Sequence, residues 1–106
     1  MSLELLKRAI ELRAPITFEY GTTPGERKGN PHMVFTIKRK DGVETTKVEI
    51  DQTAGASKSG VPFPSWRRFD LDKLNVLAVH EEDAPFKQSE EYNPESLDYQ
   101  FVIARI

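Results

Sequence analysis

Hydrophobic and polar positions near the N-terminus follow the period of a helix. Leu3, Leu6 and Ile10 recur every three or four positions, and Ser2 before them is a residue type suited to capping a helix. Pro15 ends the pattern, because the residue that precedes a proline is displaced from helical geometry. The N-terminal segment is therefore predicted to form an amphipathic helix that ends before residue 15.

After residue 15 the apolar positions alternate with a period of two, which is typical of half-buried strands. Strands are predicted at residues 16–20, 32–40 and 43–50, and Asp41-Gly42 is a strong signal for a two-residue hairpin turn. Residues 21–31 contain three glycines and two prolines and are predicted to form a loop.

The second half of the chain alternates between polar connections and short strands. Residues 51–66 are predicted to form a long glycine-rich connection, a kind of segment that is often functional or mobile in small domains. Strands are predicted at 66–69 and 75–80, joined by a tight turn. Residues 81–96 are acidic and are predicted to be poorly ordered.

The last ten residues admit two interpretations. Asn93-Pro94 is typical of a helix start, whereas Tyr99, Phe101 and Ile103 alternate as in a strand. We favour a strand that packs on the same domain. One helix followed by five or six short strands predicts a mainly β protein, a small partly open barrel with helical additions. Most core contacts are expected from Leu6, Ile10, Ile16, Phe18, Val34, Phe35, Ile37, Phe69, Leu71, Leu74, Val76 and Val79.

Length and composition are those of one globular domain. The chain has 106 residues, of which 38% are hydrophobic and 30% are charged. It has no cysteine, so disulfides, thiolate metal sites and thiol nucleophiles are excluded, and a reducing cytoplasm is the expected location. The N-terminus is too charged for a signal peptide, and no stretch approaches the ~20 apolar residues of a membrane span.

The net charge of −2 is distributed unevenly. Residues 27–73 carry ten basic and six acidic side chains, a net charge of +4, whereas residues 74–106 carry two basic and seven acidic ones, a net charge of −5. A basic segment can attract phosphate even in a mildly acidic protein, because exposed charges are screened beyond ~8–10 Å. A solvated surface of mixed charge is an equally good interpretation of the same pattern.

Sequence motifs for catalysis and metal binding are missing. His32 and His80 are the only histidines and lack the spacing of a zinc site. Asp70 and Asp72 could share a face of a strand and bind a hard cation, but we favour a capping role for Asp72 in the turn. There is no nucleophile elbow and no phosphate-binding loop of the P-loop type. We therefore predict no catalytic residues, no metal, no cofactor and no enzymatic activity for this chain alone.

Arginines next to aromatic residues are the remaining chemical signal. Arg27 precedes Lys28, and Arg67 and Arg68 lie between Trp66 and Phe69. A guanidinium pairs bidentately with phosphate, and neighbouring aromatic rings can stack on bases. The same aromatic residues are also typical of a core. Adjacent strand residues point to opposite faces, so only one of the two arginines at 67 and 68 can face a given site. The basic run at 38–40, next to the hairpin turn, is interpreted as a solubilising strand end.

Three segments resemble the WYL domain, a family of bacterial regulators and accessory proteins. They are "AIELRAPITFEY" at 9–20, "RKGNPHMVFTI" at 27–37 and "RRFDLDKLNVLAV" at 67–79. The third is the most specific, because arginine, phenylalanine, leucine and aspartate all fall in register with the family pattern. The tryptophan and tyrosine that name the family have no counterpart in "TTKVEI" at 45–50.

The resemblance implies an Sm-like (Src-homology-3-like) barrel with an N-terminal helix over residues 1–80, followed by an acidic tail and an apolar segment at 81–106. It also implies a ligand-sensing, transcription-regulating domain that binds single-stranded nucleic acid or a nucleotide, with no membrane partner. At the matched positions, Arg27, His32 and Arg67 should line the ligand site. Without the resemblance, a lone histidine at the start of a strand is more often a surface or packing residue than a ligand-binding one. The alternative function is a protein-interaction module or accessory subunit whose acidic tail and Pro-Phe-Pro loop hold a partner.

Overall fold

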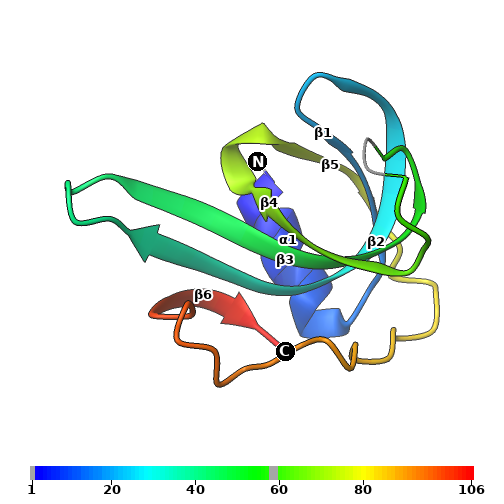
Figure 1. Ribbon diagram of the computed structural model, residues 1–106. Coiled ribbons are helices and arrows are strands. Elements are labelled where there is room, and N and C mark those ends of the chain that lie inside the picture. The colour runs from blue at the N-terminus through cyan, green and yellow to red at the C-terminus, as the bar shows by residue number, and fades with distance from the viewer. Residues whose placement is uncertain (1, 58–59) are drawn as a thin grey trace.

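The computed structural model describes residues 2–57 and 60–106. Residues 58 and 59 of the predicted long connection lie outside this description. The chain forms one N-terminal helix and an antiparallel sheet of six strands, so the predicted mainly β class is confirmed (Figure 1). The elements are helix α1 (Ser2–Leu12), strands β1 (Ile16–Tyr20), β2 (Thr23–Lys38), β3 (Glu44–Gly55) and β4 (Ser65–Asp70), the 3-10 turn η1 (Leu71–Lys73), and strands β5 (Leu74–Val79) and β6 (Phe101–Arg105).

Helix α1 forms where the apolar period predicts it, and it ends before Pro15. Leu6, Ala9 and Ile10 on one face of the helix are buried against the sheet. The Ser2 hydroxyl donates a hydrogen bond to the carbonyl of Leu74 (3.0 Å) and accepts one from the backbone amide two residues further along β5 (3.1 Å). These bonds connect the first turn of the helix to β5. Among the described residues no helix is long and apolar enough to cross a membrane.

The strands are ordered β4-β3-β2-β1-β5 in the sheet, and β6 pairs with the second half of β2. β4 and β5 occupy the two edges of this order, although only the three residues of η1 separate them in the sequence. No backbone pairing joins these two edges within the part of the chain that the structure describes, so the curved sheet is not closed. The β2–β3 hairpin, with its turn at the predicted Asp41-Gly42, projects from the body of the sheet (Figure 1).

The prediction of a loop at residues 21–31 is wrong for most of that segment. β2 begins at Thr23, and its first half pairs with β1 on one side and with β3 on the other. Few apolar side chains occur there, so the sequence lacks the alternation of a strand, and the pairing comes instead from two neighbouring backbones. Pro31 lies beside an irregularity in the pairing with β3, which accommodates the missing amide hydrogen.

β3 also extends beyond its predicted end at residue 50, as far as Gly55. Gly55 has φ +100°, and a Cβ there would lie 2.3 Å from the carbonyl oxygen of Glu26. Only glycine satisfies both conditions. The close approach lets β3 pair with β2 up to Arg27, which brings the strand that carries this arginine next to the end of β3.

The core contains most of the predicted residues and several that were not predicted. Nine of the twelve predicted residues are buried, whereas Ile37, Leu71 and Val79 are partly buried. A second cluster joins Met33 and Phe35 to Tyr92 of the acidic tail.

The tail between β5 and β6 has no helix or strand, yet Phe86 and Tyr92 within it are buried. Its backbone is attached as well, since the Phe86 amide donates a hydrogen bond to the carbonyl of Arg13 (2.8 Å). β6 confirms the strand interpretation of the C-terminal residues.

Candidate functional site

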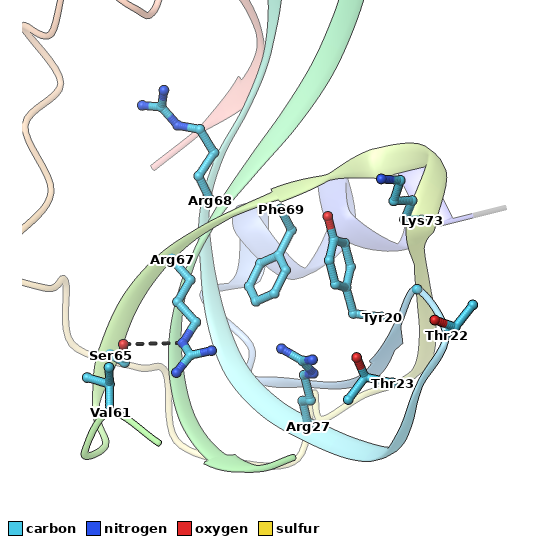
Figure 2. Close-up of a pocket in the computed structure, with 11 residues that line it drawn as sticks. Tyr20, Thr22, Thr23, Arg27, Val61, Ser65, Arg67, Arg68, Phe69 and Lys73 are labelled. Carbon is cyan, nitrogen blue, oxygen red and sulfur yellow. Dashed lines mark hydrogen bonds between the residues drawn. The ribbon is translucent and has the colours of Figure 1, made fainter. Parts of the chain in front are cut away.

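A cavity of about 770 Å³ opens between the β1–β2 turn, β4 and η1 (Figure 2). It contains two of the three predicted ligand residues, Arg27 and Arg67. The residues that line it are Tyr20, Gly21, Thr22, Thr23, Arg27, Val61, Ser65, Arg67, Arg68, Phe69 and Lys73.

Arg27 reaches the cavity from β2 and is only 4% exposed. Its guanidinium carbon lies 5.6 Å from the ring centroids of both Tyr20 and Phe69, a distance suited to cation–π contact. Its buried Nε has no hydrogen-bond partner among the described residues. Burial lowers the pKa of Arg27, and the nearby charge of Arg67 lowers it further. An arginine nevertheless stays protonated at neutral pH, so the cavity wall contains a desolvated positive charge.

Arg67 reaches the same cavity from β4. Its Nε donates a hydrogen bond to the hydroxyl of Ser65 (3.2 Å), and its Nη2 donates one to the hydroxyl of Ser57 (2.8 Å). Its guanidinium carbon lies 5.9 Å from the ring centroid of Phe63. These contacts orient the Arg67 fork toward Arg27, as Figure 2 shows.

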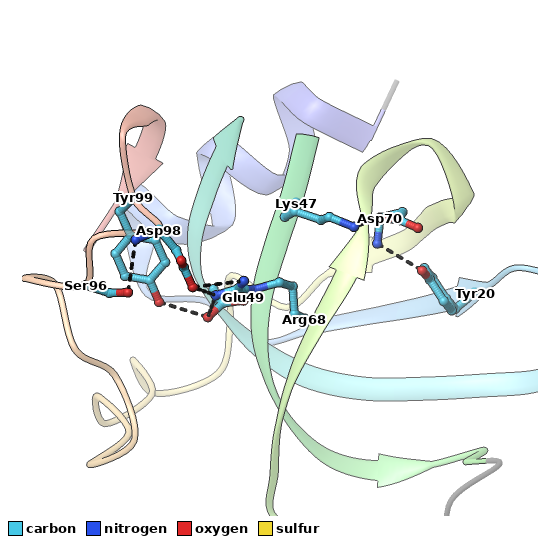
Figure 3. A network of polar contacts seen from close by, with 8 residues as sticks. All are labelled: Tyr20, Lys47, Glu49, Arg68, Asp70, Ser96, Asp98 and Tyr99. Carbon is cyan, nitrogen blue, oxygen red and sulfur yellow. Dashed lines mark hydrogen bonds and ion pairs between the residues drawn. The ribbon is translucent and has the colours of Figure 1, made fainter. Parts of the chain in front are cut away.

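Arg68, the next residue of β4, points away from Arg67, as strand alternation predicts (Figure 2). Its Nε donates a hydrogen bond to Glu49 (2.7 Å), and its terminal nitrogens donate to Asp98 (3.2 Å). Tyr99 donates to the same Glu49 carboxylate (2.8 Å), so one buried acid joins β3, β4 and the C-terminal segment (Figure 3). The hydrogen bond with Glu49 raises the pKa of Arg68. We interpret this network as structural.

The electrostatic character of the cavity follows from its lining. Among the described contacts of its basic residues, Arg68 pairs with Glu49 and Lys73 lies 3.7 Å from Asp70, and both of these acids lie outside the lining. None of the described residues that line the cavity is acidic. The cavity therefore presents Arg27 and Arg67 to its contents without a lining carboxylate between them.

Asp70 and Asp72 lie in different elements, at the end of β4 and within η1. The Asp70 carboxylate contacts Lys47 (Figure 3) and lies 3.7 Å from Lys73. Its hydrogen bond with Lys47 lowers the pKa of Asp70. Its side chain makes no capping bond to η1. Within residues 2–57 and 60–106 no three side chains of the metal-ligating types are grouped together.

His32, the third predicted ligand residue, lies outside the lining of this cavity and is fully buried. Its Nε2 accepts a hydrogen bond from the Ser89 amide (2.9 Å), so its Nδ1 carries the proton and donates to the Asn30 carbonyl (2.8 Å). Its ring centroid lies 5.0 Å from those of Trp66 and Phe86. His32 thus holds the acidic tail on the sheet, which is the packing role that a lone histidine allows.

The aromatic residues next to Arg67 and Arg68 in the sequence, Trp66 and Phe69, pack against other side chains of the protein. Trp66 packs with His32 and Tyr92, away from the cavity. Phe69 is buried and makes edge contacts with the rings of Phe18 and Tyr20 (centroids 5.3 and 4.7 Å). The core interpretation of these residues is therefore the one that the structure supports.

Several residues that line the cavity were not predicted as site residues from the sequence. Thr22 lies in the β1–β2 turn, Thr23 is the first residue of β2, and Tyr20 is the last residue of β1. The signal available for Tyr20 was its position at the end of an alternating strand. Nothing in the local sequence marks the two threonines, because their place beside Arg27 follows from the pairing of β1 with β2.

Comparison of the chain with models of protein families, with curated protein sequences and with solved structures found no significant match.

Proposed function

We propose that this chain is a non-catalytic ligand-binding domain that takes up a phosphate-bearing ligand, single-stranded nucleic acid or a nucleotide, in the cavity formed by Arg27 and Arg67. The observation that carries the proposal is the burial of the Arg27 guanidinium beside Arg67 in a lining without acidic residues.

The energetic reason is desolvation. A buried charge is costly unless an opposite charge and hydrogen bonds compensate it. Among the described residues, the rings of Tyr20 and Phe69 face the Arg27 guanidinium, and its Nε has no hydrogen-bond partner. A phosphate supplies a negative charge and several acceptor oxygens, which a guanidinium fork binds bidentately. Ligand binding therefore recovers part of the cost of burying Arg27.

The resemblance to WYL domains supports a sensing role in bacterial transcription regulation, with the cytoplasm as the location. Two features support the proposal of an Sm-like, partly open barrel: the N-terminal helix lies over a curved sheet, and only three residues separate the two edge strands in the sequence. In this proposal Arg27 and Arg67 contact the ligand. His32 acts at a distance, by fixing the tail that packs beside β2 and Trp66.

Fluorescence anisotropy with labelled single-stranded oligonucleotides and nucleotides at two salt concentrations tests the proposal. Arg67→Ala should weaken binding by about 1–3 kcal/mol. The slope of the logarithm of the binding constant against the logarithm of the salt concentration should become less negative by about 0.7 for each phosphate contact that is lost. Arg39→Ala, at the hairpin tip and paired with Asp41 (2.8 Å), is the matched control and should change little. Absence of saturable binding at low salt, or equal losses in both variants, would refute the proposal. Turnover of a nucleotide that disappears in Arg67→Ala would overturn its non-catalytic part.

A second candidate function is self-association through β6. Phe101, Val102 and Ile103 are 50%, 42% and 41% exposed, and no described strand pairs with the outer edge of β6. An unprotected apolar edge is a template for adding another strand. The occupant proposed is a second copy of the chain, because antiparallel pairing centred on Ile103 places Phe101 of one copy opposite Arg105 of the other, a favourable cation–π pair.

Sedimentation velocity over a range of concentrations tests this second candidate. A dimer that is lost in Ile103→Lys, where two lysines would meet at the symmetry axis, supports it. Val43→Lys, at an exposed apolar residue of the hairpin tip, is the control and should still dimerise. A monomer at every concentration would refute it.

A further inference from the structure

The buried position of Arg27 restricts which phosphate can reach it. Arg27 is 4% exposed and forms the wall of the cavity, with Tyr20 and Phe69 against its guanidinium. An internal phosphate of a nucleic acid has chain leaving it on both sides, so it reaches a surface arginine more easily than a buried one. A terminal phosphate has chain on one side only, and it can enter a cavity with its free oxygens first.

The positive charge of the two arginines also favours a terminal phosphate over an internal one. Burial lowers the pKa of Arg27, and the positive charge of Arg67 nearby lowers it further, so the two guanidinium groups lie within electrostatic reach of one another. A phosphodiester carries one negative charge, whereas a phosphomonoester carries about −1.5 to −2 at pH 7. Two adjacent guanidinium groups are better compensated by the second species, which also offers three terminal oxygens rather than two.

The cavity offers little for reading a base. The aromatic rings among its described lining residues, Tyr20 and Phe69, pack against Arg27 and against each other, and Phe69 is buried. The Tyr20 hydroxyl accepts a hydrogen bond from the Asp70 amide (2.9 Å), which fixes the ring further. Trp66, the residue best suited to stacking, packs instead against the rings of His32 and Tyr92. Recognition in this cavity is therefore centred on the phosphate.

From these observations we infer that Arg27 and Arg67 select a terminal phosphomonoester of a single-stranded oligonucleotide over its internal phosphodiesters, with little preference for base sequence. The inference rests on the proposed function, because it concerns the same cavity. It adds that the domain distinguishes chain ends by their phosphorylation.

Competition binding tests the inference. The probe is a short oligothymidine with a 5′-phosphate and a 3′ fluorophore, and the unlabelled competitors share its sequence but end in a 5′-phosphate, a 3′-phosphate or hydroxyl groups only. Thymidine monophosphate is a fourth competitor, which shows whether a free nucleotide suffices. We expect at least one phosphate-ended oligonucleotide to compete about tenfold better than the hydroxyl-ended one, the equivalent of one additional charge-assisted hydrogen bond. That advantage should shrink at pH 5.5, where most of the monoester has taken up one proton and carries a charge closer to −1.

Alanine variants of the arginines test whether the preference for a terminal phosphate arises in the cavity. Arg67→Ala should reduce the advantage of the phosphate-ended competitor more than it reduces binding of the hydroxyl-ended one, whereas Arg39→Ala should preserve both. Arg27→Ala should abolish the advantage, and urea unfolding checks that this buried variant still folds. Saturable binding that depends on Arg67 but is equal for all ends would overturn the inference and leave the proposed function standing. Failure of the probe and of every competitor to bind would overturn both.

Discussion

Replacing Gly55 by alanine tests the close packing of β3 against the strand that carries Arg27. The alanine Cβ would lie 2.3 Å from the carbonyl oxygen of Glu26 and 2.6 Å from the Cα of Arg27. Both atoms belong to the backbone of β2, so a side-chain rotation cannot relieve the contact. Either β2 and β3 separate locally, or the pairing between Arg27 and Gly55 is lost.

Two costs contribute to the expected loss of stability. Gly55 has φ +100°, and an alanine in this region of backbone conformation costs about 1–2 kcal/mol. The backbone clash adds a further cost of the kind seen in overpacked cores, about 1–3 kcal/mol. Together they predict a fall of about 2–5 kcal/mol in the free energy of unfolding.

Gly42 provides the matched control, because it separates the two costs. It also has positive φ (+87°), but a Cβ there meets nothing within 4 Å. Gly42→Ala should therefore show the conformational cost alone. Urea unfolding followed by circular dichroism measures both variants, and the difference between them is the cost of the clash. If Gly55→Ala costs no more than Gly42→Ala, the described approach of β3 to β2 is wrong.

The remaining predictions concern the core and the tail. Leu74→Ala should lower the free energy of unfolding by about 2–5 kcal/mol in urea denaturation, because its side chain is buried under α1; a loss below about half a kcal/mol would contradict that burial. Tyr92→Phe should leave stability unchanged or slightly raised, because the buried hydroxyl has no hydrogen-bond partner among the described residues; a loss above about 1 kcal/mol would reveal one. Burial lowers the pKa of His32 below its ordinary 6.5, so the unfolded chain takes up the proton first. The contribution of neutral His32 to stability should therefore be complete above pH 6.5 and decline as the pH falls below 6.5. Urea unfolding midpoints at pH 7.5 and 5.5 measure this decline. His32→Gln should make the decline smaller, and an equally steep decline in the variant would show that other groups cause it.

Local pattern was enough to predict most of the regular elements. The spacing of Leu6 and Ile10 predicted the helix, alternation predicted β1 and β5, and Asp41-Gly42 predicted the hairpin turn. These features depend on residues close in sequence, which the period of a helix or strand relates directly to one face. The first half of β2 was missed, because its backbone pairs with two strands while its side chains show no alternation.

The candidate site could be predicted only in part. Strand alternation predicted that Arg67 and Arg68 would face opposite ways, and the structure confirms it. The resemblance to WYL domains singled out Arg27 and Arg67, which do meet in one cavity, and also His32, which lies elsewhere and holds the tail. The burial of Phe86 could not be foreseen, because the acidic residues around it predicted disorder.

The sequence by itself determined the class of the fold, since apolar periodicity decides which residues can share a buried face of a helix or strand. Tertiary structure alone decided that Arg27 is buried beside Arg67 and that His32 is bonded to the tail. The physical reason is the range of the interactions. Periodicity acts between neighbours in sequence, whereas desolvation, charge proximity and strand pairing depend on which distant segments the folded sheet brings together.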